Sequence, residues 1–249
     1  MPAVKAWLPD QWPEGDEVNR WWQAGFTDGA DPEYEEQILP MAVEHLAGSS
    51  AVLDVGTGEG QIARLAKRNG TARVVGVDPT WTQVVEAHRR GGGPAYSRAS
   101  AHNLPFGSES FDAVVACLVF EHIDDVDVAI AEVARVLRPG GRFLFFLNHP
   151  LLQTPGSGWI DDHILEEQYW RVGPYLRNDS TIEEVAPGVN LPFMHRPLSR
   201  YVQVMGEVGL LIDDMDEPPP PPGFLDEAWE YGEASSIPRL MLLRARRVR

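Results

Sequence analysis

The 249 residues suffice for one α/β domain with a large core and a modest insertion, but not for two equal domains. A formal charge of −16, from 37 acidic and 21 basic residues, would repel a phosphate backbone and argues against nucleic acid as a partner. No apolar run approaches the roughly 18 residues that span a bilayer, and a single cysteine excludes an intrachain disulfide and a cysteine-cluster zinc site, so we expect a water-soluble protein with no membrane partner.

The N-terminal segment, residues 1–48, is expected to form a helical cap. Its first residues lack the apolar stretch of a secretory signal, which predicts a cytoplasmic protein. Residues 16–46 are acidic and have helical spacing that breaks near residues 28–32, so two short helices should pack on the domain. Trp21 and Trp22 lie in the first of them, and large aromatics in a small cap are more often packing residues than ligand contacts.

Short β-rich runs alternate with helical stretches from residue 51 to residue 148, which is typical of a parallel sheet with crossover helices. The run Arg138-Pro139-Gly140-Gly141 should end a helix and turn into the next strand. The expected strands are 51–55, 73–77, 95–99, 111–116 and 142–147, and the expected helices are 59–68, 82–90 and 126–137.

The alternation fails over residues 149–196, which are rich in Pro, Gly and aromatic residues. A long irregular insertion in a compact domain is usually a lid or a binding loop. The regular pattern then resumes, with a helix expected at 197–208 and strands at 210–215 and 239–247. Residues 218–222 are five prolines, which predict a stiff structural turn.

The strongest chemical signal is Val52-Leu53-Asp54-Val55-Gly56-Thr57-Gly58-Glu59-Gly60, a buried strand that runs into a glycine-rich turn before a helix. Glycines allow the backbone to turn tightly and to approach a ligand closely. Asp78 ends the second strand twenty residues after Gly58, the spacing at which a carboxylate reaches the two hydroxyls of a ribose. The pattern therefore predicts a ligand that contains a nucleoside.

The turn departs from the dinucleotide fingerprint, because its third glycine is Gly60 and the fingerprint would place it at position 61. A pyrophosphate needs an open helix N-terminus, whereas Glu59 would put a negative charge there. Together with Asp54, this charge suits a ligand that carries an amino group and a sulfonium. A nicotinamide-dependent oxidoreductase stays open as an alternative, as does a regulatory protein that binds the ligand without catalysis.

With these residues in view, the sequence resembles the class I S-adenosylmethionine-dependent methyltransferases, and within them the small-molecule, ubiquinone-type (methyltransferase type 11-like) subgroup. The resemblance covers about residues 40–148 and depends on four pieces in the expected order. It implies a Rossmann-like three-layer sandwich with a mostly parallel seven-stranded sheet, an antiparallel last strand and an inserted lid, over residues 49–249. The pieces are Leu53-Asp54-Val55-Gly56-Thr57-Gly58-Glu59-Gly60, Gly76-Val77-Asp78, Ala101-His102-Asn103-Leu104-Pro105-Phe106 with Ser110-Phe111-Asp112, and Glu121-His122 with Glu132-Val133-Ala134-Arg135-Val136-Leu137-Arg138-Pro139-Gly140-Gly141.

The resemblance also implies roles for individual residues toward S-adenosylmethionine and its product S-adenosylhomocysteine. Asp78 would hold the ribose hydroxyls. Ser100 stands where the family usually has an acidic residue for the adenine amino group, and a hydroxyl accepts that bond less strongly. The other residues implied are Asp54, Gly56, Thr57 and Gly58 at the methionine part, Pro79, Ala101 and His102 at the adenine, and Leu118 and His122 at the amino-acid end.

The donor already carries the activation for methyl transfer, so the protein mainly has to align the reactants and exclude water. If the acceptor loses a proton, a histidine base would help. His149, directly after the fifth strand, and His195, at the end of the insertion, are the candidates. Aromatic residues of the insertion, Tyr169, Trp170 and Tyr175, would line a pocket for a hydrophobic or aromatic acceptor, or else attach the lid to the body.

The acidic pairs of the sequence have no spacing that indicates a metal cage, so we expect no metal. A small-molecule acceptor is expected. The acceptor itself, the atom that is methylated, the need for a base and the oligomeric state stay open.

Overall fold

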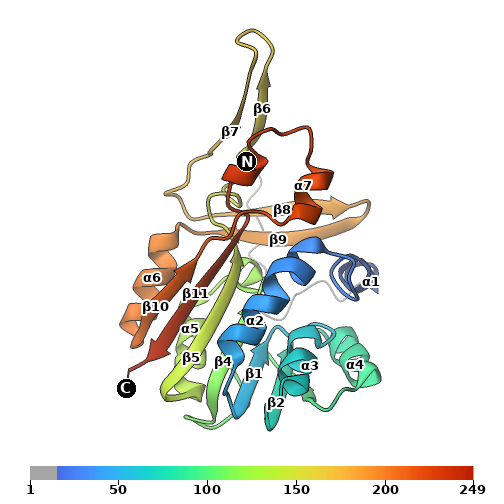
Figure 1. The fold of residues 1–249 in the computed structure, drawn as a ribbon. Coiled ribbons are helices and arrows are strands. Elements are labelled where there is room, and N and C mark those ends of the chain that lie inside the picture. Colours follow the sequence, from blue (N-terminus) through green and yellow to red (C-terminus); the bar gives the residue numbers. More distant parts are fainter. Residues whose placement is uncertain (1–15, 249) are drawn as a thin grey trace.

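The structure is a computed structural model that describes residues 16–248. The expected cap over residues 1–48 therefore begins outside the described residues, and the stretch that lacks a secretory signal also lies there. No helix within residues 16–248 is both long and apolar enough to cross a bilayer. Figure 1 shows a broad sheet flanked by helices, with two hairpins at one end of it.

The core of the molecule is a seven-stranded sheet with the order β10-β11-β5-β4-β1-β2-β3. Strands β1 to β5 pair with one another in parallel, and β11 is antiparallel to both β5 and β10. This is the Rossmann-like sheet with an antiparallel last strand that the sequence predicts. The strands are β1 (Ala51–Val55), β2 (Arg73–Asp78), β3 (Ala95–Arg98), β4 (Phe111–Cys117), β5 (Leu137–Asn148), β10 (Leu210–Asp216) and β11 (Leu240–Arg247).

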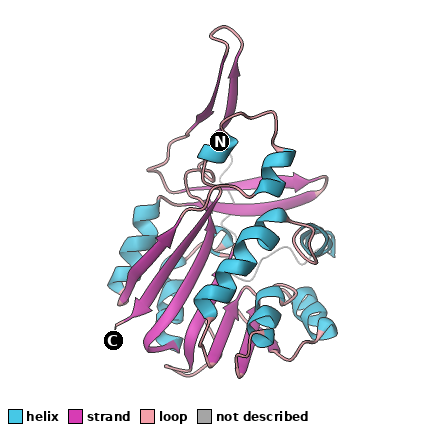
Figure 2. Ribbon diagram, viewed as in Figure 1, coloured by secondary structure: helices cyan, strands magenta, loops and turns pink. Residues whose placement is uncertain are grey.

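Helices cover both faces of the sheet and make the expected three layers (Figure 2). One apolar cluster joins the sheet to α2, α3 and α4, and a second joins the opposite face to α5 and α6. Every residue of β1 is buried, as is typical of a central parallel strand. The helices are α2 (Leu39–Leu46), α3 (Gln61–Arg68), α4 (Trp81–Arg90), α5 (Val126–Val136) and α6 (Leu198–Glu207).

Before the sheet, α1 (Asp16–Gly25) and a short π-helical turn η1 (Tyr34–Ile38) precede α2. Trp21 and Trp22 of α1 pack against Phe26, with ring centroids 5.2 and 4.7 Å from it. The break between helices near residues 28–32 lies where the sequence predicts it. This segment and the insertion together cover the carboxyl-terminal edge of the parallel strands (Figure 1).

The insertion is not irregular, which corrects the expectation from its composition. It forms two antiparallel hairpins, β6 (Gly158–Asp162) with β7 (Glu167–Arg171) and β8 (Asp179–Ala186) with β9 (Val189–His195). The β6–β7 hairpin projects from the body, whereas β8–β9 lies across the end of the sheet (Figure 1). Backbone hydrogen bonds between the two strands give each hairpin a regular structure, which the proline and glycine content of the segment does not predict. Two short elements, α7 (Pro222–Glu227) and η3 (Ala234–Ser236), follow the proline run.

The run Arg138-Pro139-Gly140-Gly141 also differs from its expected role, since it belongs to β5 and not to a turn before it. Leu137 pairs with Phe111 and Arg142 pairs with Ala113, so four residues on β5 stand opposite Asp112 alone. The extra residues form a bulge, in which Gly140 adopts a φ of +78°. A bulge lets the strand begin directly after α5 without a separate loop.

Candidate active site

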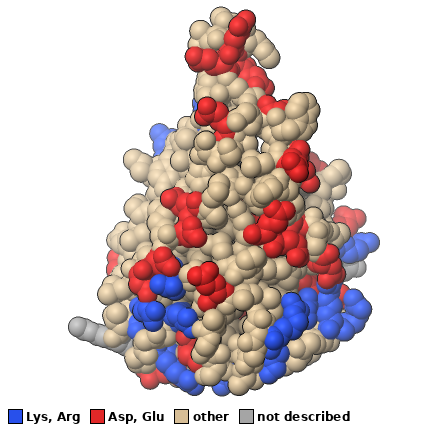
Figure 3. All heavy atoms as spheres, viewed as in Figure 1, with Lys and Arg blue, Asp and Glu red and all other residues tan. Residues whose placement is uncertain are grey.

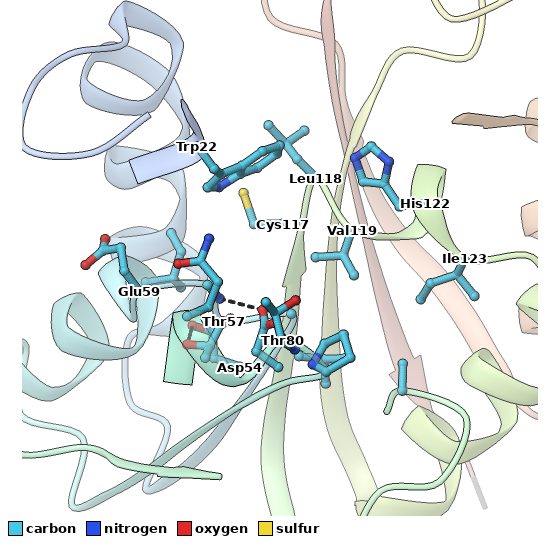
Figure 4. A pocket seen from close by; sticks show the side chains of 18 of the residues that line it. Trp22, Asp54, Thr57, Glu59, Thr80, Cys117, Leu118, Val119, His122 and Ile123 are labelled. Atoms are coloured by element: carbon cyan, nitrogen blue, oxygen red, sulfur yellow. Dashed lines mark hydrogen bonds between the residues drawn. The ribbon is translucent and has the colours of Figure 1, made fainter. Parts of the chain in front are cut away.

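A pocket lies at the edge of the sheet where β1, β2 and β4 end. We call the lining residues within 54–62, 78–83 and 99–102 the floor, and Val18, Asn19 and Trp22 of α1 with Pro192 and Met194 of β9 the roof. In Figure 4, Trp22 and Leu118 lie on the opposite side of the pocket from Asp54 and Thr80. The structure brings together all eleven residues that the sequence proposes for the cofactor, namely Asp54, Gly56, Thr57, Gly58, Asp78, Pro79, Ser100, Ala101, His102, Leu118 and His122.

Asp54 supports the glycine loop from below. Its carboxylate accepts hydrogen bonds from the Thr57 hydroxyl at 2.6 Å and from the Ala63 backbone N–H at 3.0 Å. The side chain is almost fully buried, and burial raises its pKa to about 7 despite these two donors. Asp54 therefore fixes the start of α3 relative to β1.

Asp78 connects the end of β2 to the same loop. One carboxylate oxygen accepts from the Gly58 backbone N–H at 3.0 Å and the other from the Thr80 backbone N–H at 2.8 Å. Burial raises the pKa of this carboxyl to about 6. The two bonds hold the carboxylate at the border of the pocket, and each oxygen keeps a further lone pair for a hydroxyl group.

The glycines of the loop have two different uses. Gly56 and Gly60 adopt φ values of +71° and +90°, and a Cβ at Gly56 would collide with the Val119 side chain. A Cβ at Gly58 would meet no protein atom within 4 Å. The backbone at Gly58 therefore borders free space in the pocket, where a ligand can approach it closely.

Glu59 does not present its charge to the pocket as the sequence suggests. Its carboxylate pairs with Arg64 at 2.5 Å and with Arg90 at 3.0 Å, and Figure 4 shows it turned away from Asp54 and Thr57. A buried carboxylate needs a cation nearby, because desolvation of an unpaired charge is costly. The charge of Glu59 is therefore balanced by these arginines and is not directed toward a ligand.

At the far end of the floor, Ser100 and His102 contact each other. The Ser100 hydroxyl accepts from the His102 backbone N–H at 3.2 Å and lies 3.1 Å from the imidazole Nδ1. Part of the hydrogen-bonding capacity of the Ser100 hydroxyl is thus used inside the turn. This agrees with a weaker contact to an adenine amino group than a carboxylate would make.

Leu118 and His122 follow β4. Leu118 adopts a φ of +53°, a conformation that leucine rarely takes and that occurs often at functional sites. His122 lies 2.7 Å from the Pro192 carbonyl oxygen through Nδ1, and burial lowers its pKa to about 4. A neutral imidazole that donates from Nδ1 therefore links this loop to β9.

The two histidines proposed as bases do not line the pocket. His149 lies 2.6 Å from Glu217 through Nε2, and its Nδ1 accepts from the Leu151 backbone N–H at 3.1 Å. His195 contacts the Tyr175 carbonyl oxygen at 2.8 Å. Both rings are buried at the base of the insertion, so the geometry favours a structural task for them.

The aromatic residues proposed for the acceptor also lie away from the pocket. Tyr169 and Trp170 belong to the projecting β7, and Trp170 packs edge-on against Trp159 with ring centroids 5.6 Å apart. The Tyr175 hydroxyl accepts from the Leu198 backbone N–H at 2.9 Å, at the start of α6. The Tyr175 contact fits the alternative that the sequence left open, in which such residues attach the insertion to the body, whereas the Trp170 contact stays within the insertion.

Sequence reasoning missed the residues that close the pocket. Trp22 lines it as well as packing in the cap, and Val18 lies one helical turn earlier on the same face of α1. The four-residue spacing of Val18 and Trp22 could have indicated their shared face from the sequence. The contribution of Pro192 and Met194 could not have been predicted, because nothing in the sequence pairs β9 with α1. Within residues 16–248 there is no group of three or more His, Cys, Asp or Glu side chains placed to hold a metal ion.

Comparison with known proteins agrees with this geometry. Residues 53–145 match the family model of a methyltransferase domain. A ubiquinone/menaquinone biosynthesis C-methyltransferase UbiE from Desulfotalea psychrophila is 36% identical over 120 residues, which cover 47% of this chain and 48% of that protein. A demethylmenaquinone methyltransferase from Thermotoga maritima is 31% identical over 47% of this chain and 50% of its own length.

Among solved structures, an S-adenosylmethionine-dependent methyltransferase from Mesorhizobium loti is similar with a TM-score of 0.73 and 26% identity. That likeness covers 87% of this chain and 98% of the other. The chain spans about half the length of the curated relatives that it matches. The sequence likeness is thus concentrated in the sheet and the floor, while the likeness in fold extends over most of the molecule.

Proposed function

We propose that this chain is a class I S-adenosylmethionine-dependent methyltransferase, which transfers a methyl group from S-adenosylmethionine to a small molecule and releases S-adenosylhomocysteine. The observation that carries the proposal is the Asp78 carboxylate, which is held by Gly58 and Thr80 at the border of the pocket. A carboxylate at the end of the second strand suits two adjacent ribose hydroxyls.

The residues of the pocket fit this cofactor. The free space at Gly58 accommodates a ligand against the backbone, and Pro79 and Ala101 supply apolar contacts for a flat base beside Asp78. Gln61, at the start of α3, has a side-chain amide that is buried without a hydrogen-bond partner among the described residues. An amide both donates and accepts, so it suits the ammonium and carboxylate of a methionine.

The bound donor supplies a methyl group on a positively charged sulfur, which is already activated for transfer. The chain's residues bind and orient. Asp54 holds the loop, Asp78 holds the nucleoside, and the roof excludes water from the acceptor side. None of these tasks requires a covalent bond to the protein.

We assign the acceptor to the side of the pocket under α1 and β9, and take it to be a small molecule and not a nucleic acid. The division into a cap (1–48) and a domain (49–249) with a lid (149–196) fits this assignment, with β8–β9 as the covering part. A cytoplasmic location fits the need for the donor, which is made inside cells.

Calorimetric titration with S-adenosylhomocysteine, and with NAD as the competing ligand, tests the proposal. We expect micromolar binding of the first and no binding of NAD, since the third glycine of the turn is Gly60 and the dinucleotide fingerprint would place it at position 61. Preferential binding of NAD would overturn it in favour of an oxidoreductase. Binding without release of S-adenosylhomocysteine across a broad acceptor panel would favour the regulatory alternative.

A further inference from the structure

The charged side chains around the pocket are mainly acidic. The carboxyl groups of Asp54, Asp78 and Asp124 border it, whereas the carboxylate of Glu59 is paired with Arg64 and Arg90. Among the described residues no lysine or arginine lines it. The chain as a whole carries a formal charge of −16, so no distant excess of cations compensates. On the face drawn in Figure 3, the basic side chains gather at the lower end, away from the hairpins.

The two arginines that pair with Glu59 of the floor are occupied. Arg64 and Arg90 both pair with Glu59, and Arg90 also pairs with Glu86 at 2.8 Å and with Asp28 at 2.9 Å. Their side chains are only 11% and 17% exposed. A turn of either side chain toward the pocket would break an ion pair with the buried Glu59 carboxylate, which is disfavoured.

The acceptor side is instead apolar. Val18, Trp22 and Phe26 of the cap line it together with Leu118 and Met194. The Trp22 and Phe26 rings lie with centroids 4.7 Å apart and are tilted by 31° to each other, so they offer two adjacent aromatic faces. Aromatic surfaces of this kind suit a planar, apolar molecule.

Two polar side chains that line the pocket are neutral, Tyr34 and, on the floor, Gln61. Burial raises the pKa of Tyr34 well above the ordinary value, so its hydroxyl stays protonated. The Gln61 amide is uncharged and lacks a hydrogen-bond partner among the described residues. Groups of this kind recognise a hydroxyl or carbonyl, but they do not offset a full negative charge that has been removed from water.

The donor itself meets no such barrier. It carries a sulfonium, an ammonium and a carboxylate, and its net charge is therefore positive. A negatively charged pocket attracts such a molecule and repels an anion. The same surroundings thus treat the donor and an anionic acceptor in opposite ways.

We propose that the acceptor is an uncharged molecule with a planar apolar body, and that this pocket excludes acceptors that carry a phosphate, sulfate or carboxylate. The inference rests on the proposed function, because only a methyltransferase has an acceptor. The charge preference, however, is a property of the pocket and can be measured without turnover.

The test is competition in the pocket with saturating S-adenosylhomocysteine present. N-phenyl-1-naphthylamine, an uncharged fluorescent probe, is bound first, and 2-naphthol or naphthalene-2-sulfonate is then added as competitor. Because both competitors displace the same probe, binding elsewhere on the surface is not measured. For the wild type we expect 2-naphthol to compete at least about tenfold more strongly than the sulfonate.

Met194 on β9 allows a matched pair of variants. Met194→Lys adds a cation at the acceptor side and should strengthen competition by the sulfonate about tenfold. Met194→Gln has similar length without the charge and should leave the sulfonate within about threefold of the wild type. Thermal melting of each variant confirms that it is folded.

Equal or stronger competition by the sulfonate in the wild type would overturn the proposal, and so would a pocket that binds no N-phenyl-1-naphthylamine. An unchanged sulfonate affinity in folded Met194→Lys would also overturn it. A failure of S-adenosylhomocysteine to bind would instead contradict the proposed function, and it is read separately by calorimetry.

Discussion

The two sides of the pocket are built differently. The floor depends on carboxylates that accept backbone hydrogen bonds from residues within twenty positions in sequence, as Asp54 does from Ala63 and Asp78 does from Gly58 and Thr80. The roof brings together α1 and β9 from distant parts of the chain, and an apolar cluster around Val18 and Leu191 holds them. The difference indicates that the cofactor side is fixed by local backbone geometry and the acceptor side by side-chain packing.

Asp78→Ala should have the largest effect on ligand binding, and this effect should be confined to the floor. Loss of a charge-assisted contact to two hydroxyls should weaken S-adenosylhomocysteine binding about 100-fold. Isothermal titration calorimetry measures this, with Asp127→Ala on the surface as control. A 100-fold loss would tie cofactor binding to the floor, whereas an unchanged affinity in a folded variant would remove Asp78 from the cofactor site.

Trp22→Ala sharpens the comparison from the roof. It should weaken N-phenyl-1-naphthylamine binding about tenfold, because a large aromatic contact is lost, and change S-adenosylhomocysteine affinity less than about threefold. Trp229→Ala, whose side chain is 81% exposed and outside the pocket, is the matched control. A larger effect on the nucleoside than on the probe would contradict the separation of floor and roof.

His149→Ala tests whether the base of the insertion takes part in catalysis. Since its imidazole is bonded to Glu217 and Leu151, we expect turnover to change less than about threefold and the melting temperature to fall by about 3 °C. Steady-state rates and thermal melting separate the two effects. A rate loss of 100-fold at unchanged stability would instead make His149 the base that its place after β5 suggests.

The smallest effect should be a pH dependence that arises near the floor. Burial raises the pKa of Asp54 and of Glu121 to about 7, so each contributes stability at low pH that is lost as pH rises through 7. His122, with its pKa lowered to about 4, is neutral in the folded state over this range but loses its remaining protonation in the unfolded state, so it offsets a small part of this loss. The ligand-free protein should therefore melt about 3 °C lower at pH 8 than at pH 6.5.

Asp54→Asn is the control, because it removes one of these two carboxyls. Its melting temperature should vary less over the same pH range. If the wild type instead becomes more stable toward pH 8, the two carboxyls are not protonated at pH 6.5. The pH dependence would then not arise from Asp54 and Glu121.

The parallel part of the sheet could be predicted from the sequence because its strands are short apolar runs and its turns carry Gly, Pro or Asp. The floor followed from the same runs, since Asp54, the glycines and Asp78 each end a predicted strand. The insertion could not be predicted in this way. The order of β8–β9 comes from pairing between its strands, and its contact with α1 joins segments with no shared pattern. His149 and Tyr175 were reasonable candidates by position, but their partners, Glu217 and Leu198, are fixed only by the tertiary fold.

Cys117 ends β4 and is the chain's single cysteine. It is buried, its thiol donates to the Tyr34 hydroxyl at 3.7 Å, and burial raises its pKa far above the ordinary value. Thiol-directed dyes should therefore leave the native protein unlabelled. A cysteine placed at Ile164, which is 92% exposed at the tip of the β6–β7 hairpin, would then take up a single label with no background substitution. Spectroscopy could follow the motion of that hairpin in an otherwise unmodified chain.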